Sequence, residues 1–155
     1  MSFAEALSSV FTNYFNFSGR ARRTEYWLFT LFNFFIGIIL GALQTFVSSD
    51  LEIISIIYSV AIFFPSLAVT VRRLHDTGRS GWFIFLPILP YVIGVVLFVI
   101  SGIEAILYIF IALFAVMTII YLVWLFTDSQ PGTNQYGPNP KEKGTKDDEE
   151  IIQKD

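Results

Sequence analysis

The sequence predicts an all-α membrane protein with four transmembrane helices, preceded by an amphipathic N-terminal helix and followed by a disordered charged tail. The 155-residue chain is 54% apolar and only 15% charged, whereas soluble domains average about 25% charged residues. Only seven of its 23 charged residues lie between Tyr26 and Phe126. A soluble fold is excluded, because so short a chain has no polar elements to cover four apolar helices.

The first element, residues 1–17, has apolar side chains such as Phe3, Leu7 and Val10 at helical spacing, with serines and Glu5 on other faces. We expect an amphipathic helix here. Helices that lie on a membrane usually carry Lys or Arg on the polar face, and this one carries only Glu5. Two placements therefore stay open, on the inner leaflet or docked against the helix bundle.

The predicted membrane domain, residues 18–140, has spans at about 26–47, 51–71, 82–101 and 103–126. Each approaches the roughly 20 residues that a helix needs to cross a hydrocarbon core about 30 Å thick. Asn33 and Gln44 in the first span are expected to form interhelical hydrogen bonds. Gly37 and Gly41 form a Gly-x-x-x-Gly motif, which predicts close helix packing either within the chain or between two copies. Kinks are expected at the three prolines inside the spans, which are Pro65, Pro87 and Pro90.

The basic residues predict the orientation of the spans. All ten Lys and Arg residues lie before span one, between spans two and three, or after span four. The other two connections have no basic residue, and their charged residues are the acids Asp50, Glu52 and Glu104. The positive-inside rule therefore places both termini in the cytoplasm of a multi-pass inner-membrane protein. The acidic connections are expected to be tight turns with Ser-x-x-Glu capping boxes, at Ser49 to Glu52 and at Ser101 to Glu104. Ser80 is the expected N-cap of span three. Beyond Pro140, ten of the last fifteen residues are charged, which predicts a disordered tail over residues 141–155.

Three polar segments meet on the predicted inner face and carry a family resemblance. They contain Gly-Arg-x-x-Arg-x-Glu-Tyr-Trp at 19–27, Arg-Arg-Leu-His-Asp-x-Gly-x-Ser-Gly-Trp at 72–82, and Gly-x-Asn-x-Tyr-Gly-x-x-Pro at 132–140. In this order the motifs resemble the YhaH-like bacterial inner-membrane proteins, called the domain of unknown function 805 family. The resemblance covers roughly residues 11–140. It implies a small four-span membrane protein and brings no established activity with it.

The polar segments define a candidate platform for binding or for structure. Arginine presents a planar fork of donors that pairs bidentately with carboxylate or phosphate, and Glu25, Asp76 and Asp128 are the expected carboxylate partners. The candidate residues are Arg20, Arg22, Arg23, Glu25, Trp27, Arg72, Arg73, His75, Asp76, Arg79, Trp82, Asp128, Asn134 and Tyr136.

We predict a non-enzymatic binding or scaffold protein whose platform receives a partner protein or anionic phospholipid headgroups. One alternative is a subunit of an oligomeric transporter or channel, although the spans lack the ionisable residues that ion-coupled carriers use. Another is a headgroup-modifying enzyme with His75 beside Asp76 as general base. No cofactor or metal is expected, since the chain has no cysteine and one histidine. The expected partners are the bilayer and either another membrane protein or a second copy. A net charge of −3 argues against nucleic acid.

Overall fold

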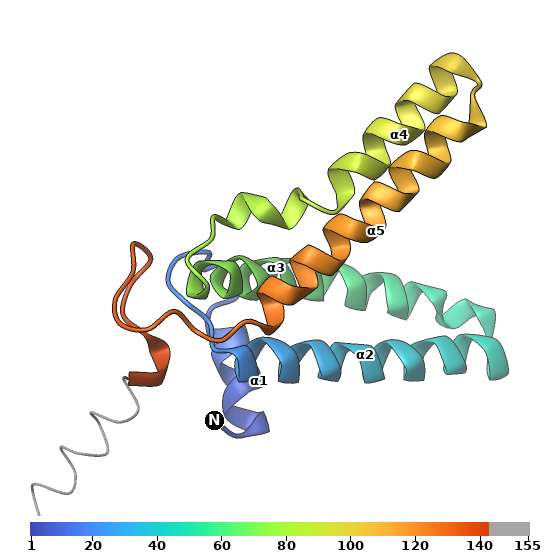
Figure 1. Ribbon diagram of the computed structural model, residues 1–155. Coiled ribbons are helices and arrows are strands. Elements are labelled where there is room, and N and C mark those ends of the chain that lie inside the picture. The colour runs from blue at the N-terminus through green and yellow to red at the C-terminus, as the bar shows by residue number, and fades with distance from the viewer. Residues whose placement is uncertain (143–155) are drawn as a thin grey trace, which may run out of the picture.

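The computed structural model describes residues 1–142 and is built from α-helices (Figure 1). Most of the predicted tail therefore lies outside the described residues. The helices are α1 (Phe3–Thr12), α2 (Arg23–Phe46), α3 (Glu52–Asp76), α4 (Ile88–Ser101) and α5 (Glu104–Phe126), with short 3-10 helices η1 (Ser49–Leu51) and η2 (Gly81–Phe85). The prediction of an all-α membrane protein is confirmed.

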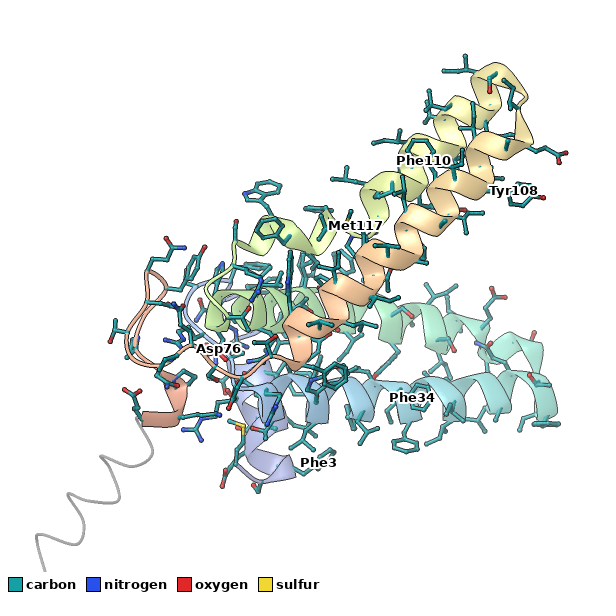
Figure 2. The ribbon with its side chains drawn as sticks, in the orientation of Figure 1. Phe3, Phe34, Asp76, Tyr108, Phe110 and Met117 are labelled. Atoms are coloured by element: carbon teal, nitrogen blue, oxygen red, sulfur yellow. The ribbon has the colours of Figure 1, made fainter. Side chains whose placement is uncertain are left out.

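The long helices form two hairpins, α2 with α3 and α4 with α5, which diverge from a shared base (Figure 1). Their tips are short connections, and Gly102 ends α4 in the left-handed conformation with φ of 68°, which glycine adopts without strain. The three polar segments, residues 17–27, 72–82 and 128–140, gather where the hairpins diverge and form what we call the base. Figure 2 shows Asp76 there, whereas Phe34 and Tyr108 point outward from their hairpins. Most large apolar side chains of the hairpins are exposed in the isolated chain, as expected of surfaces that face lipid.

The third span is not the continuous helix predicted at 82–101. Helices α2, α3 and α5, with 23 to 25 residues, are long and apolar enough to cross a bilayer, but the chain reaches α4 only after η2, and α4 has 14 residues. Pro87 is the N-cap of α4 and Pro90 lies in its first turn. The first N–H groups of a helix have no partner within it, so proline is tolerated there. The two prolines therefore set the start of α4 rather than kink a longer helix.

The capping boxes predicted at the tips are wrong. The N-cap residues are Leu51 for α3 and Ile103 for α5, and neither makes a side-chain cap. Ser101 still belongs to the last turn of α4, where its hydroxyl donates to the Leu97 carbonyl over 2.8 Å. At the other tip the η1 turn delays the start of α3. Ser80 does cap η2, as predicted, by accepting from the Trp82 backbone N–H.

Helix α1 docks on the base of the first hairpin and runs crosswise to α2 (Figure 1). Val10 is fully buried with Ala21, Phe29 and Val69 in the apolar core. Docking is therefore the arrangement found, although Phe3 and other aromatic side chains of this segment stay exposed.

Pro65 lies inside α3 and has no N–H to donate to the Ala61 carbonyl. The Tyr14 hydroxyl, just beyond α1, donates to that carbonyl instead. This contact ties the docked segment to the interior of α3.

Between α2 and α3, both predicted polar contacts are present. Tyr58 donates to Asn33 Oδ1 over 2.6 Å, and Gln44 donates to the Ser55 hydroxyl over 2.5 Å. The first-span glycine motif, by contrast, packs against nothing in the described chain, since a Cβ built at Gly37 would meet no atom within 4 Å.

Close helix packing occurs instead at Gly94 of α4. A Cβ added there would lie 2.3 Å from Cβ of Phe110 on α5. The second hairpin therefore depends on glycine at this position.

Candidate functional site

Asp76, the last residue of α3, is fully buried and accepts hydrogen bonds from three side chains. Arg20 Nε donates to its Oδ1 over 3.0 Å, and Arg73 Nη1 donates to its Oδ2. Ser129 Oγ donates to the same Oδ2 over 2.6 Å. The donors come from all three polar segments, so a single carboxylate joins them.

Two guanidinium groups share this carboxylate, and backbone carbonyls meet their remaining N–H groups. Arg20 donates to the carbonyls of Gln130 over 2.5 Å and Gly132 over 2.7 Å. These bonds fix the segment that follows α5 against the end of α3. A flexible amine could not reach both carbonyls and the carboxylate, whereas the five donors of a planar guanidinium can.

Arg73 connects the two hairpins. From the end of α3 it donates to the carbonyl of Leu125 over 3.2 Å and to that of Thr127. The last carbonyls of a helix have no partner within it, and a cation there also complements the helix dipole. Trp27 Nε1 adds a bond of 3.3 Å to the Leu125 carbonyl. The C-terminal end of α5 is thus held by side chains of the first hairpin.

Glu25 and Arg72 form a second buried ion pair, with 3.0 Å between Oε1 and Nη1. Ser9 of α1 donates its hydroxyl to the same carboxylate oxygen over 3.1 Å, so α1 contacts the pair directly. Arg72 is 4% exposed, and its Nε and Nη2 have no hydrogen-bond partner among residues 1–142.

The side chains of His75 and Asp76, which are neighbours in the sequence, make their contacts with different partners. The His75 ring stacks on Tyr136, with ring centres 3.8 Å apart and planes 2° apart, and its Nδ1 lies 3.2 Å from the Gly19 carbonyl. Asn134 Nδ2 donates to the His75 carbonyl over 2.9 Å. The carboxylate of Asp76 is meanwhile occupied by its three donors, so it does not orient the imidazole as a general base would need.

Other candidate residues lie at the edge of the site. Arg22 donates to the Pro140 carbonyl, and Arg23 is exposed beside Trp27, which stacks on Phe126. Arg79 lies over the Trp124 ring, 4.5 Å from its centre, and partial burial lowers its pKa. Trp82 is 79% exposed.

Asp128 is the one expected carboxylate that pairs with no arginine. It is exposed and accepts a hydrogen bond from Lys141 instead. The Lys141 ammonium and, to a lesser extent, the Ser129 backbone N–H lower the pKa of the carboxyl group. The hydroxyls of Ser129 and Ser9 take part in the site, and sequence analysis missed both. A serine next to a motif gives no signal that its hydroxyl meets a distant charge.

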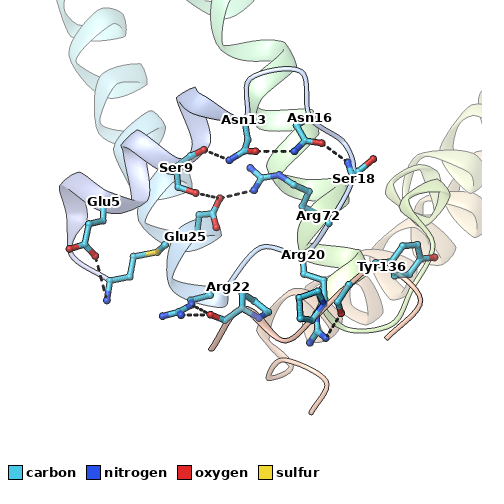
Figure 3. A pocket seen from close by; sticks show the side chains of 15 residues that line it. Glu5, Ser9, Asn13, Asn16, Ser18, Arg20, Arg22, Glu25, Arg72 and Tyr136 are labelled. Atoms are coloured by element: carbon cyan, nitrogen blue, oxygen red, sulfur yellow. Dashed lines mark hydrogen bonds and ion pairs between the residues drawn. The ribbon is translucent and has the colours of Figure 1, made fainter. Parts of the chain in front are cut away.

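A polar cavity of about 860 Å³ opens between α1, the ends of α2 and α3, and residues 136–140 (Figure 3). Arg20, Arg22, Glu25 and Arg72 all line it. No cluster of three or more His, Cys, Asp or Glu side chains suited to a metal occurs among residues 1–142. The cavity instead presents arginine side chains, and among them Arg72 keeps two N–H groups without a partner among these residues.

The fold and the site define a multi-pass helical membrane protein whose two hairpins are joined at an arginine-rich base. Residues 14–138 match the family model described as protein of unknown function (DUF805), and the chain belongs to that family. It is 38% identical to the inner membrane protein YhaI of Escherichia coli strain K12 over 133 residues, which cover 86% of this chain and 92% of YhaI. It is 34% identical over 136 residues to the inner membrane protein YhaH of the same strain, covering 85% and 93% of the two chains. No solved structure matches it significantly. The chain is thus a multi-pass inner-membrane protein.

Proposed function

We propose that this protein is a non-enzymatic binding protein whose base lies at the cytoplasmic membrane surface and holds anionic phospholipid headgroups, with both termini in the cytoplasm. The observation that carries the proposal is the pairing of two arginines, the exposed Arg23 and the partly buried Arg79, with tryptophans at the ends of apolar helices. Arg23 shares a groove of about 370 Å³ with Trp27, Leu28 and Phe126, and Arg79 lies over Trp124.

This arrangement suits a phospholipid at the membrane interface. Indole rings favour the headgroup level, where one edge contacts water and the rest apolar chains. A guanidinium beside them can bind phosphate, and the apolar part of the same groove can receive the start of an acyl chain. Each cation near an anionic surface adds about 1 kcal/mol of attraction.

The contacts of the buried arginines favour a structural role for the inside of the base over a catalytic one. Arg20 and Arg73 are engaged with Asp76 and with backbone carbonyls. Asp76 is equally engaged, which leaves His75 without an orienting carboxylate among residues 1–142. The inner residues thus hold the base together. Arg23 and Arg79 each use Nη1 on a backbone carbonyl, of Phe126 and Thr77 respectively, which leaves their other N–H groups for a ligand.

The test measures the phospholipid that stays with protein purified in a mild uncharged detergent. We expect phosphatidylglycerol to be enriched over its share of the membrane. In the double variant R23Q/R79Q the affinity for phosphatidylglycerol should fall about fivefold for each arginine lost. The control K141Q removes a cation that pairs with Asp128 and should retain phosphatidylglycerol as the wild type does.

Unchanged enrichment in R23Q/R79Q would contradict the proposal. A stoichiometric copurifying protein without anionic lipid would also contradict it, and would favour a partner protein as the ligand of the base.

A further inference from the structure

The polar cavity under α1 contains an arginine whose hydrogen bonding is incomplete. Arg72 lines the cavity, and its Nη1 donates to the Glu25 carboxylate. Its Nε and Nη2 are buried without a partner among residues 1–142. A buried charged donor without a partner is costly, so a missing acceptor is expected at this side chain.

The geometry of the two atoms specifies that acceptor. In a guanidinium group the Nε–H and one Nη2–H point in the same direction and form one edge of the planar fork. Such an edge donates two parallel hydrogen bonds to two oxygens of one phosphate or carboxylate group. The opposite side of the guanidinium is already taken by Glu25, so the free edge is held in a fixed orientation.

The charges around the cavity favour an anion. Arg20, Arg22 and Arg72 line it. Arg20 pairs with Asp76 and Arg72 with Glu25. Arg22 donates to the Pro140 carbonyl and forms an ion pair with no acid among residues 1–142, so its positive charge is in excess. Of the two acids in the lining, Glu25 accepts from Ser9 and Arg72, and Glu5 accepts from the Ser2 backbone N–H in the capping box of α1. The acids are therefore already paired within the protein.

We propose that this cavity binds a phosphate group through the Nε and Nη2 edge of Arg72. The inference deepens the proposed function, because it adds a specific enclosed phosphate site to the two arginines, Arg23 and Arg79, described above. The phosphate comes either from a phospholipid headgroup or from a free phosphate ester. The volume of about 860 Å³ is large enough for either.

The experiment uses the full chain in an uncharged detergent. Its melting temperature is measured against increasing inorganic phosphate, glycerol phosphate or phosphatidylglycerol in mixed micelles, with chloride at equal ionic strength as reference. A ligand that binds the folded state raises the melting temperature. Stabilisation by inorganic phosphate or glycerol phosphate assigns a free phosphate as a source, and stabilisation by phosphatidylglycerol alone assigns the lipid.

The variant R72K keeps the charge but loses the fork. We expect its affinity for the stabilising ligand to fall about tenfold or more, as the loss of a charge-assisted hydrogen bond implies. The control K141R also exchanges one cation for another, at an exposed residue that does not line the cavity. It should bind inorganic phosphate as the wild type does.

If R72K does not fold, the variant E25Q tests the phosphate site instead. Glutamine keeps an oxygen that can accept from Arg72 Nη1 but removes a negative charge close to the phosphate, so phosphate should raise the melting temperature of E25Q more than that of the wild type. An equal or smaller rise would overturn the proposal.

Absence of stabilisation by every phosphate probe would also overturn it, as would equal affinities in the wild type and R72K. Where phosphatidylglycerol is the only probe that stabilises the wild type, its retention in R72K and its loss in R23Q/R79Q would overturn the cavity site and leave the proposed function standing.

Discussion

Replacing Asp76 by asparagine tests whether its carboxylate holds the base together. Asparagine has the same shape but no charge, and it puts an NH2 group where one carboxylate oxygen stood. In the wild type that carboxylate accepts from Arg20 over 3.0 Å, from Arg73, and from Ser129 over 2.6 Å. The variant leaves two buried guanidinium groups without a counter-charge and places a donor against other donors.

The burial of the group sets the size of the effect. The side chains of Asp76 and Arg73 are 0% exposed, and that of Arg20 is 1% exposed. Removing one partner of a buried ion pair costs about 3 to 5 kcal/mol of unfolding free energy. For a chain of this size that corresponds to a fall in melting temperature on the order of 10 °C.

Asp128 provides the matched control. It is also an aspartate of the base, but its side chain is 59% exposed and pairs with a surface lysine. Exposed pairs contribute about 0 to 1 kcal/mol, so D128N should melt close to the wild type.

Tryptophan fluorescence in detergent is a suitable readout. Trp27 stacks on Phe126 and donates to the Leu125 carbonyl, so its emission reports on the contact between the hairpins. Equal melting temperatures for the wild type, D76N and D128N would refute the reasoning, and Asp76 would then be free for a role in chemistry.

Three further predictions concern the helices. G94A should destabilise the protein by about 1 to 3 kcal/mol, because the added methyl group overpacks the contact between α4 and α5, whereas G37A should be neutral in the same melting assay. Y14F should cost about 0.5 to 1.5 kcal/mol through loss of the bond to the carbonyl that the α3 proline leaves free, and a melting temperature equal to the wild type would contradict this. A cysteine replacing Ser8 should resist an impermeant thiol reagent in intact cells while one replacing Ser101 reacts, and the reverse pattern would invert the proposed orientation.

The sequence predicted the parts of the fold that depend on local composition. Runs of apolar residues located α2, α3 and α5, because hydropathy over about 20 residues is a direct measure of the cost of leaving lipid. The break before α4 was not predicted. Pro87 and Pro90 are compatible with a kinked helix or with a helix start, and only the packing of α4 along α5 decides between these.

The candidate site was predictable to a similar degree. Six arginines near three acids indicated ion pairs, and Glu25 and Asp76 do form them. The partner of Asp128 was not predictable, because it depends on the path of the chain after α5. The polar cavity was also beyond sequence reasoning, since it exists only where α1 docks against segments more than 100 residues away.

Contacts at the base must supply much of the free energy that holds the two hairpins together. Between helices in lipid there is no hydrophobic driving force, because acyl chains are as apolar as leucine. The hairpins diverge along their length (Figure 1), so their lipid-facing surfaces add little to the joint. The contacts that join the hairpins lie at the base: η2 packs against α3, Arg73 and Trp27 donate to the end of α5, and Arg20 donates to the segment beyond it. Arg20 and Arg73 both donate to the Asp76 carboxylate, so the connection between the hairpins depends on a single buried acid at the base.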